Sequence, residues 1–210
     1  STLQSSIAYQ FGELGNSRFD YPGGANPSPT YYQKLPSYFL ADSDGPDYAG
    51  AYLAQEQLLT NGQIDWNRIY DANVNAAASD LPAAYVLYED RSDDSQLTLN
   101  TSLKSFLSDE VSIVFALTHQ DVQSENFAEI QDLMGASNYL NRDSFDGYAY
   151  NLEDPDGTAG VGDRFKYNYI FDVQQTEVFL KAQFSLNRFD GFAAGSYKSP
   201  SYQREGLYRH

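Results

Sequence analysis

The sequence predicts an all-β chain, specifically a segment of an antiparallel transmembrane β-barrel with about five long strands and long extracellular loops that contain short helices. Apolar and polar residues alternate over stretches long enough to cross a bilayer as strands. Tight turns of about four residues alternate with two much longer connections, which is typical of outer-membrane barrels. Aromatic residues make up 15% of the chain, and such rings suit surfaces that are apolar on one side and wet on the other.

The predicted strands follow from the alternation and from the residues that interrupt it. They lie near 2–13, 81–107, 110–122, 164–187 and 190–204. Tight turns are expected at 107–110 and 187–190, both at the same edge of the sheet. Long loops are expected near 14–80 and 123–163, at the opposite edge. A soluble sandwich would more often show shorter strands with closer turn signals.

The alternation also predicts which side chains share a face. One face should meet lipid and carry Leu97, Leu99, Val111, Ile113, Phe115, Leu117, Leu180 and Phe184. The other should line the lumen and carry Gln96, Asn100, Lys104, Gln183 and Ser185. The apolar residues occupy odd positions up to 173 and even positions from 178 onward, so a bulge or a break is expected near 174–176.

Three short helices are expected in the long loops. Residues 49–59 read as a helix that ends at the Asn-Gly pair 61–62. Asp65 can cap a second helix with Trp66, Ile69, Tyr70 and Val74 on one face. Ser124 can cap a third, with its apolar positions at Phe127, Ile130, Leu133 and Met134 and its end at Gly135.

Composition excludes several classes of protein. The chain has 29 acidic and 13 basic residues, a net charge of −16, so it should repel nucleic acid. It has no Cys, which excludes disulfide scaffolds, thiol nucleophiles and Cys-ligated metals. No apolar run approaches the roughly 20 residues of a membrane helix, so any membrane span must be β. No signal peptide precedes the first strand pattern, and the chain reads as a piece of a longer protein.

The sequence offers little for catalysis or metal binding, and we predict no enzyme, no catalytic residue, no metal and no cofactor. His119 continues the apolar parity of its strand and is expected near an interface, and His210 is terminal. Acidic turns at 42–47 and 154–157 carry oxygen ligands of the kind calcium favours, but the first lacks the downstream Glu of an EF-hand. Both are expected to be solvated turns.

Loop aromatic residues are the candidate ligand-binding groups. Rings at Tyr31, Tyr32, Trp66 and Tyr70 could stack on a ligand. The alternative is that loop rings pack the loop helices together, because a long ordered loop needs a small core of its own.

Several stretches resemble one family. They are NPSPTYY at 26–32, LPSYF at 35–39, GQIDWNRIYDAN at 62–73, AYVLYED at 84–90, SENFAE at 124–129 and SYQREGLY at 201–208. Together they resemble the barrel region of Bacteroidetes-type TonB-dependent outer-membrane receptors, closest to the Oar-like members that carry a carboxypeptidase-regulatory-like domain.

The resemblance implies a transport barrel of about 22 strands with an N-terminal plug, located in the outer membrane of a Gram-negative cell. The implied partners are outer-membrane lipid, the rest of the same barrel and its plug, TonB through a missing N-terminal part, and an unknown substrate. This sequence contains neither a plug nor a TonB box, and five strands are fewer than the roughly eight that close even a small barrel.

Two other functions stay open. One is a secreted or surface-attached β-rich binding module, for example for carbohydrate, and the other is a hydrolase. A signal peptide just before residue 1 and a stop codon soon after residue 210 would favour the binding module, whereas a plug upstream and more alternating strands downstream would favour the receptor.

Overall fold

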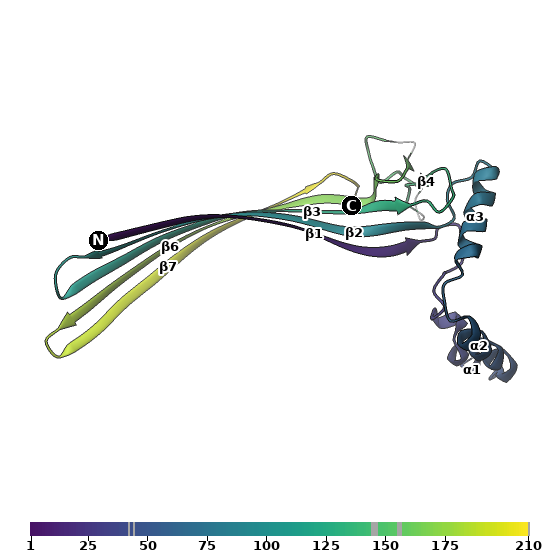
Figure 1. The fold of residues 1–210 in the computed structure, drawn as a ribbon, viewed down its shortest axis with the longest axis horizontal. Helices are drawn as coiled ribbons and strands as arrows, with labels where there is room; N and C mark the ends of the chain where they lie inside the picture. The colour runs from purple at the N-terminus through teal and green to yellow at the C-terminus, as the bar shows by residue number, and fades with distance from the viewer. Residues whose placement is uncertain (42, 44, 144–146, 155–156, 210) are drawn as a thin grey trace. The chain divides into compact units, whose positions relative to one another are not determined.

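A computed structural model describes residues 1–209 except 42, 44, 144–146 and 155–156. Its main element is a five-stranded sheet in the order β1-β2-β3-β6-β7 (Figure 1). The strands are β1 Thr2–Asp20, β2 Val86–Phe106, β3 Val111–Asp132, β6 Arg164–Leu186 and β7 Phe189–Gly206. β1 and β7 are edge strands, so within the described residues the sheet is open. The all-β class and the five long strands are confirmed.

Both tight turns lie at the same end of the strands, as predicted (Figure 1). In the first, between β2 and β3, the Leu107 N–H donates to the Val111 carbonyl over 2.9 Å. In the second, the last β6–β7 pair is Leu186 with Phe189, and Asn187 has a φ of +49°. Asn tolerates this left-handed conformation better than most residues, so it suits so short a turn. The Ser185 N–H donates to the Glu110 carbonyl, which joins the two turns directly.

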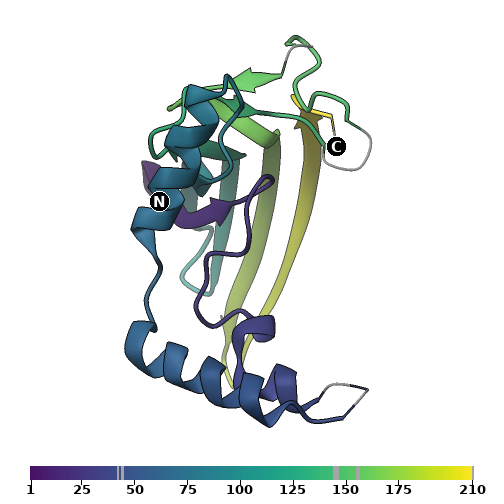
Figure 2. The ribbon, with the colours of Figure 1, turned by 90° about the vertical axis from the view of Figure 1, so that its right-hand side faces the viewer.

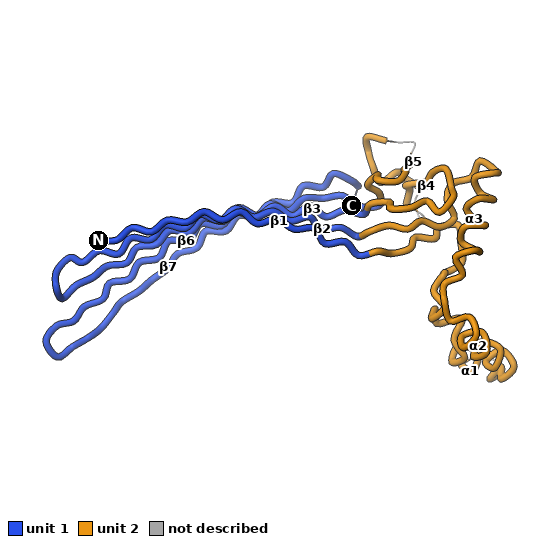
Figure 3. Tube along the Cα trace, in the orientation of Figure 1, with its two compact units in different colours: residues 1–16, 90–128, 166–210 blue, residues 17–89, 129–165 orange. Residues whose placement is uncertain are grey.

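The chain divides into two compact units (Figure 3). Unit 1 consists of residues 1–16, 90–128 and 166–210, and unit 2 of residues 17–89 and 129–165. Unit 1 is sheet alone, and its buried residues in the described chain are Phe127, Ala128 and Asn168. The other buried residues belong to unit 2, so the conventional hydrophobic core lies there.

Unit 2 contains the helices and a small second sheet. The helices are η1 Tyr32–Lys34, α1 Pro36–Leu40, α2 Tyr48–Asn61 and α3 Trp66–Ala78, and the small sheet pairs β4 Tyr139–Leu140 with β5 Thr158–Ala159. Figure 2 shows the chain passing from the α1–α2 pair into α3. Asp47 caps α2 by accepting from the Gly50 N–H at 2.8 Å, and Asp65 caps α3 by accepting from the Arg68 N–H at 3.1 Å. Two of the three predicted helices are therefore confirmed.

The core of unit 2 is built around one buried amide. Asn73 of α3 is fully buried, and its side-chain nitrogen donates to the carbonyls of Tyr85 at 2.7 Å and Leu133 at 2.8 Å. Its side-chain oxygen accepts from the N–H groups of Ala84 at 2.9 Å and Tyr85 at 3.0 Å. Ile69, also on α3, packs with Tyr85 and Met134 beside this amide. Asn73 thus joins α3 to two other chain segments with its hydrogen-bonding capacity filled.

The predicted helix capped by Ser124 is wrong, because β3 continues through this segment to Asp132. The Ile130 N–H donates to the Asp163 carbonyl at 3.1 Å, and the Ile130 carbonyl accepts from the Gly162 N–H at 2.8 Å. These bonds to a distant segment outweigh the local three-residue spacing of apolar residues, which fits a buried strand as well as a helix.

The predicted bulge near 174–176 is also wrong. Pairing between β6 and β7 is unbroken from Tyr169 opposite Gly206 to Leu186 opposite Phe189. The change of parity therefore reflects a change in which face of β6 is apolar, not a slip of the backbone. An irregular conformation occurs instead at Lys166, where φ is +58°.

Candidate functional site

The candidate functional surface is one face of the unit 1 sheet. Side chains of opposed residues, and side chains that hydrogen-bond between neighbouring strands, lie on the same face. Ser5 bonds Thr101, and His119 bonds Thr176 at 2.9 Å, on what we call face 1. Thr118 donates to Asn100 at 2.8 Å on the opposite side, face 2.

With the period of two along each strand, these bonds assign the apolar residues of all five strands. Face 1 carries Leu3, Ile7, Leu97, Leu99, Leu103, Val111, Ile113, Phe115, Leu117, Val178, Leu180, Phe184 and Tyr197. Face 2 carries Gln96, Asn100, Lys104, Thr118, Glu177, Lys181, Gln183, Ser185 and Lys198. The predicted division of side chains between two faces is confirmed.

The apolar part of face 1 is exposed in this chain. Ile7 is 72% exposed and Leu180 is 53% exposed. β7 contributes small residues here, with Ala193 opposite Ala182 and Gly195 opposite Leu180, and a shallow hollow of about 500 Å³ lies over them. Exposed apolar side chains gathered on one face in this way mark a surface that contacts another molecule or a membrane.

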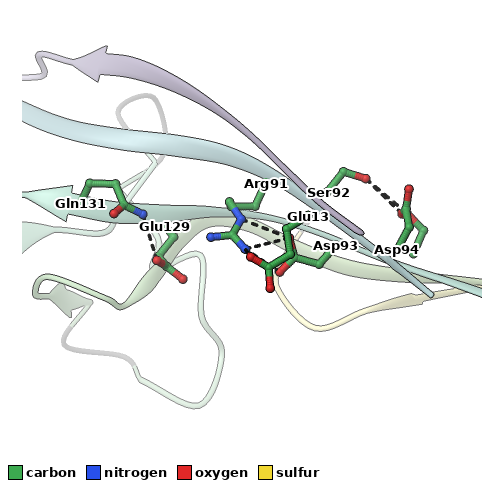
Figure 4. Close-up of polar contacts among 8 residues, drawn as sticks. Glu13, Arg91, Ser92, Asp93, Asp94, Glu129 and Gln131 are labelled. Carbon is green, nitrogen blue, oxygen red and sulfur yellow. Dashed lines mark hydrogen bonds and ion pairs between the residues drawn. The ribbon is translucent and has the colours of Figure 1, made fainter. Parts of the chain in front are cut away.

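Farther from the turns, face 1 becomes polar and charged. Arg91 donates to Glu13 at 2.9 Å and to both oxygens of Asp93 at 2.9 Å (Figure 4). Gln123 donates to Asp172 at 3.0 Å across β3 and β6. A hollow of about 460 Å³ opens here and is lined by Tyr9, Ser95, Leu97, Asp121, Gln123, Asp172, Gln174, Ser201 and Gln203. The same face therefore passes from an apolar part beside the turns to a charged part.

His119 lies at this boundary, one alternation beyond Leu117, where its Nδ1 bonds the Thr176 hydroxyl. Among the described residues no group of three or more His, Cys, Asp or Glu side chains is arranged to hold a metal ion. The acidic turns at 42–47 and 154–157, like His210, fall partly or wholly outside the described residues.

The four candidate ligand-binding aromatic residues do not form one cluster. Tyr31 and Tyr32 contact each other edge-on at 4.8 Å between ring centroids, and Tyr32 contacts Tyr38 at 5.8 Å. Trp66 packs instead on Phe19 at 5.5 Å. Tyr70, on α3, is 43% exposed. The ring contacts within unit 2 favour the alternative in which loop rings pack the loop against itself.

A second hollow, which we call the helix groove, lies within unit 2. It has a volume of about 890 Å³ and lies among the 27–29 segment, η1, α1, α2 and the start of α3. Its cations are Lys34 and Arg68 and its carboxylate is Asp65. None of the four predicted aromatic residues lines it. No sequence pattern predicted this groove, and the one available signal was a pair of cations, Lys34 and Arg68, in a strongly acidic chain.

No helix in the described part of the chain is long and apolar enough to cross a lipid bilayer.

Comparison with known proteins finds no matching family model, no matching curated protein and no matching solved structure.

Proposed function

We propose that this chain is a segment of the β-barrel wall of a TonB-dependent outer-membrane receptor, in which face 1 meets lipid and the long connections face the ligand. The observation that carries the proposal is the placement of the apolar residues on face 1. On β2 they lie between Leu97 and Leu103 and on β3 between Val111 and Leu117, which fits within the roughly ten residues that a tilted strand needs to cross a bilayer core.

The limits of the apolar part support this assignment. It begins beside the two short turns and ends where Asp121, Gln123 and Asp172 appear on the same face. Barrel strands of this class leave the membrane on the side of their long loops, where charged side chains meet lipid headgroups and water. The Arg91 contacts with Glu13 and Asp93 lie in this polar part.

Face 2 and the sheet edges support it as well. Face 2 is mainly polar along the same stretch and includes a Lys198–Glu177 ion pair at 3.0 Å, as expected of the polar interior of a barrel. β1 and β7 each present an unpaired edge within the described residues, and further strands of the same barrel would pair with them. These features support a barrel wall of any kind. The narrower assignment to a TonB-dependent receptor rests on the sequence resemblance.

The test compares two arginine substitutions at adjacent positions of β3, Phe115→Arg on face 1 and Val114→Arg on face 2. They are made in the intact gene product that carries this chain, expressed in a Gram-negative host, and assembly is measured as folded protein in the outer-membrane fraction. Charge on a lipid face near mid-bilayer costs about 2–4 kcal/mol, so Phe115→Arg should sharply reduce assembly. Val114→Arg should leave most of it intact, because the lumen is wet.

Equal assembly of the two variants would contradict the assignment of face 1 to lipid. Recovery of the wild-type protein in a soluble fraction, with no assembled form in the membrane, would contradict the whole proposal.

A further inference from the structure

We propose that the helix groove of unit 2 binds a short peptide with apolar side chains and a free C-terminal carboxylate. The inference rests on the proposed receptor function only for its biological setting, because the groove is formed by residues of unit 2 alone.

One wall of the groove is a stripe along α2. The stripe follows the helical repeat and consists of Gly50, Leu53, Ala54, Gln57, Leu58 and Asn61. Its apolar members are not fully covered within this chain: Leu53 is 66% exposed, Ala54 and Leu58 are half-buried, and Ala51, outside the stripe, is the buried residue of α2. Phe39, Ile64, Pro27 and Pro29 add to the apolar lining. Such a wall favours apolar ligand groups.

Gly50 allows α1 to approach this wall. A Cβ atom at Gly50 would lie 2.6 Å from the Phe39 ring and 2.3 Å from an Asp47 carboxylate oxygen. Only a residue without a side chain lets Phe39 line the groove at this point while the Asp47 cap is kept. The groove is therefore held by defined contacts between α1 and α2.

The cationic end of the groove is formed by Lys34 and Arg68. The Lys34 ammonium donates to the carbonyls of Asn26 at 2.6 Å and Ser28 at 3.1 Å, which uses two of its three donors and fixes its position. Partial burial lowers the pKa of Lys34, and the positive charge of Arg68 lowers that pKa further. The repulsion between these two positive charges would be relieved by a bound anion.

Asp65 is the one carboxylate of this lining, and one of its oxygens accepts from the Arg68 N–H as the cap of α3. The charged lining thus sums to one net positive charge in a chain whose net charge is −16. A carboxylate is the ligand group that best complements this end of the groove.

Amide side chains in the lining of the groove favour a peptide over a simple fatty acid. Gln33, Gln57, Asn61 and Gln63 all line the groove. Each carries a donor and an acceptor, which is what a peptide backbone requires and what an acyl chain cannot use. The volume of about 890 Å³ falls within the range of small-ligand sites.

The test is calorimetric titration of the full 210-residue chain, kept in a mild non-ionic detergent, with three probes. They are the tripeptide Ala-Leu-Leu with a free carboxylate, the same tripeptide as its C-terminal amide, and decanoate. We expect the free acid to bind about tenfold or more tightly than the amide, since the charged hydrogen bonds to the carboxylate are lost. Decanoate should bind more weakly than the tripeptide with a free carboxylate, because its acyl chain cannot use the amide side chains of the groove.

Arg68→Gln should bring the acid and the amide to within about threefold of each other, and Arg68→Lys should keep part of the preference. The matched control is Lys104→Gln, which removes a cation from unit 1 and should change nothing. Fluorescence of Trp66, which precedes Arg68 by two residues on α3, checks that the Arg68 variants stay folded.

Equal affinity for acid and amide, or no binding of the free acid, would overturn the proposal. Decanoate binding as tightly as the tripeptide would overturn the assignment to a peptide. These outcomes leave the membrane assignment standing, whereas equal assembly of Phe115→Arg and Val114→Arg would overturn that assignment and leave the groove standing.

Discussion

Asn73→Ala should strongly destabilise unit 2. The amide of Asn73 is fully buried and makes four hydrogen bonds, to two carbonyls and two backbone N–H groups. Removing it leaves the N–H groups of Ala84 and Tyr85 and the carbonyls of Tyr85 and Leu133 without this partner. A buried unpaired group costs about 1–3 kcal/mol, and a carbonyl less than an N–H because unpaired carbonyls are better tolerated.

Counting about 1–2 kcal/mol for each N–H and about 0.5 for each carbonyl gives an expected loss of about 3–5 kcal/mol. The assay is urea unfolding of the full chain in detergent, followed by the fluorescence of Trp66, the single tryptophan. Trp66 begins α3, the helix that Asn73 anchors, so its emission reports on this part of unit 2. The midpoint should fall sharply, or the variant should already be unfolded without urea.

Asn75→Ala is the matched control. Asn75 lies on the same helix, and its side chain is exposed, so its replacement should change stability by no more than about 0.5 kcal/mol. If the free energies of unfolding of Asn73→Ala and Asn75→Ala differ by less than about 0.5 kcal/mol, the buried amide does not hold unit 2 together.

Two further predictions concern pH and the isolated chain. Burial first, and then the negative charge of Asp20, raise the pKa of Tyr139, whose hydroxyl donates to that carboxylate. Since the folded state holds this proton more tightly than the unfolded state, stability should be full below about pH 10 and fall as pH rises beyond it. In Tyr139→Phe, the free energy of unfolding measured with urea should fall less as pH rises above about 10. The same pH dependence in the variant and the wild type would show that Tyr139 is not the group responsible. The isolated chain should aggregate in plain buffer and become monodisperse in detergent, because face 1 carries exposed apolar side chains and, in the described part of the chain, β1 and β7 each leave one edge unpaired. A monodisperse monomer that melts cooperatively in plain buffer, seen by light scattering and calorimetry, would count decisively against a membrane wall.

Strands and their faces could be predicted from sequence because the signal is local. Leu97, Leu99 and Phe115 alternate with polar residues over a long stretch, and a period of two admits one assignment of faces. The helix start at Asp65 was similarly readable, since the cap bond to the Arg68 N–H forms within three residues.

What could not be predicted depends on residues far apart in the chain. The end of β3 is fixed by bonds between Ile130 and residues 162–163, and the local spacing of apolar residues suggested a helix. Asn73 reads as an ordinary polar position of α3, because its partners lie at 84–85 and 133. The helix groove could not be predicted for the same reason, since Lys34 and Arg68 are far apart in the sequence and are brought together only by the fold.

The unbroken pairing of β6 with β7 limits how the length of this chain can change during evolution. Deleting one residue from β7 near Tyr197 would shift every later pair by one position and turn each following side chain to the opposite face. Changes of length within a strand therefore act on the whole remainder of that strand, whereas changes within 21–85 or 133–163 leave all five long strands in register. Insertions and deletions tolerated by natural selection should accordingly gather in these two connections, and the connections should diversify in length while the sheet keeps its dimensions.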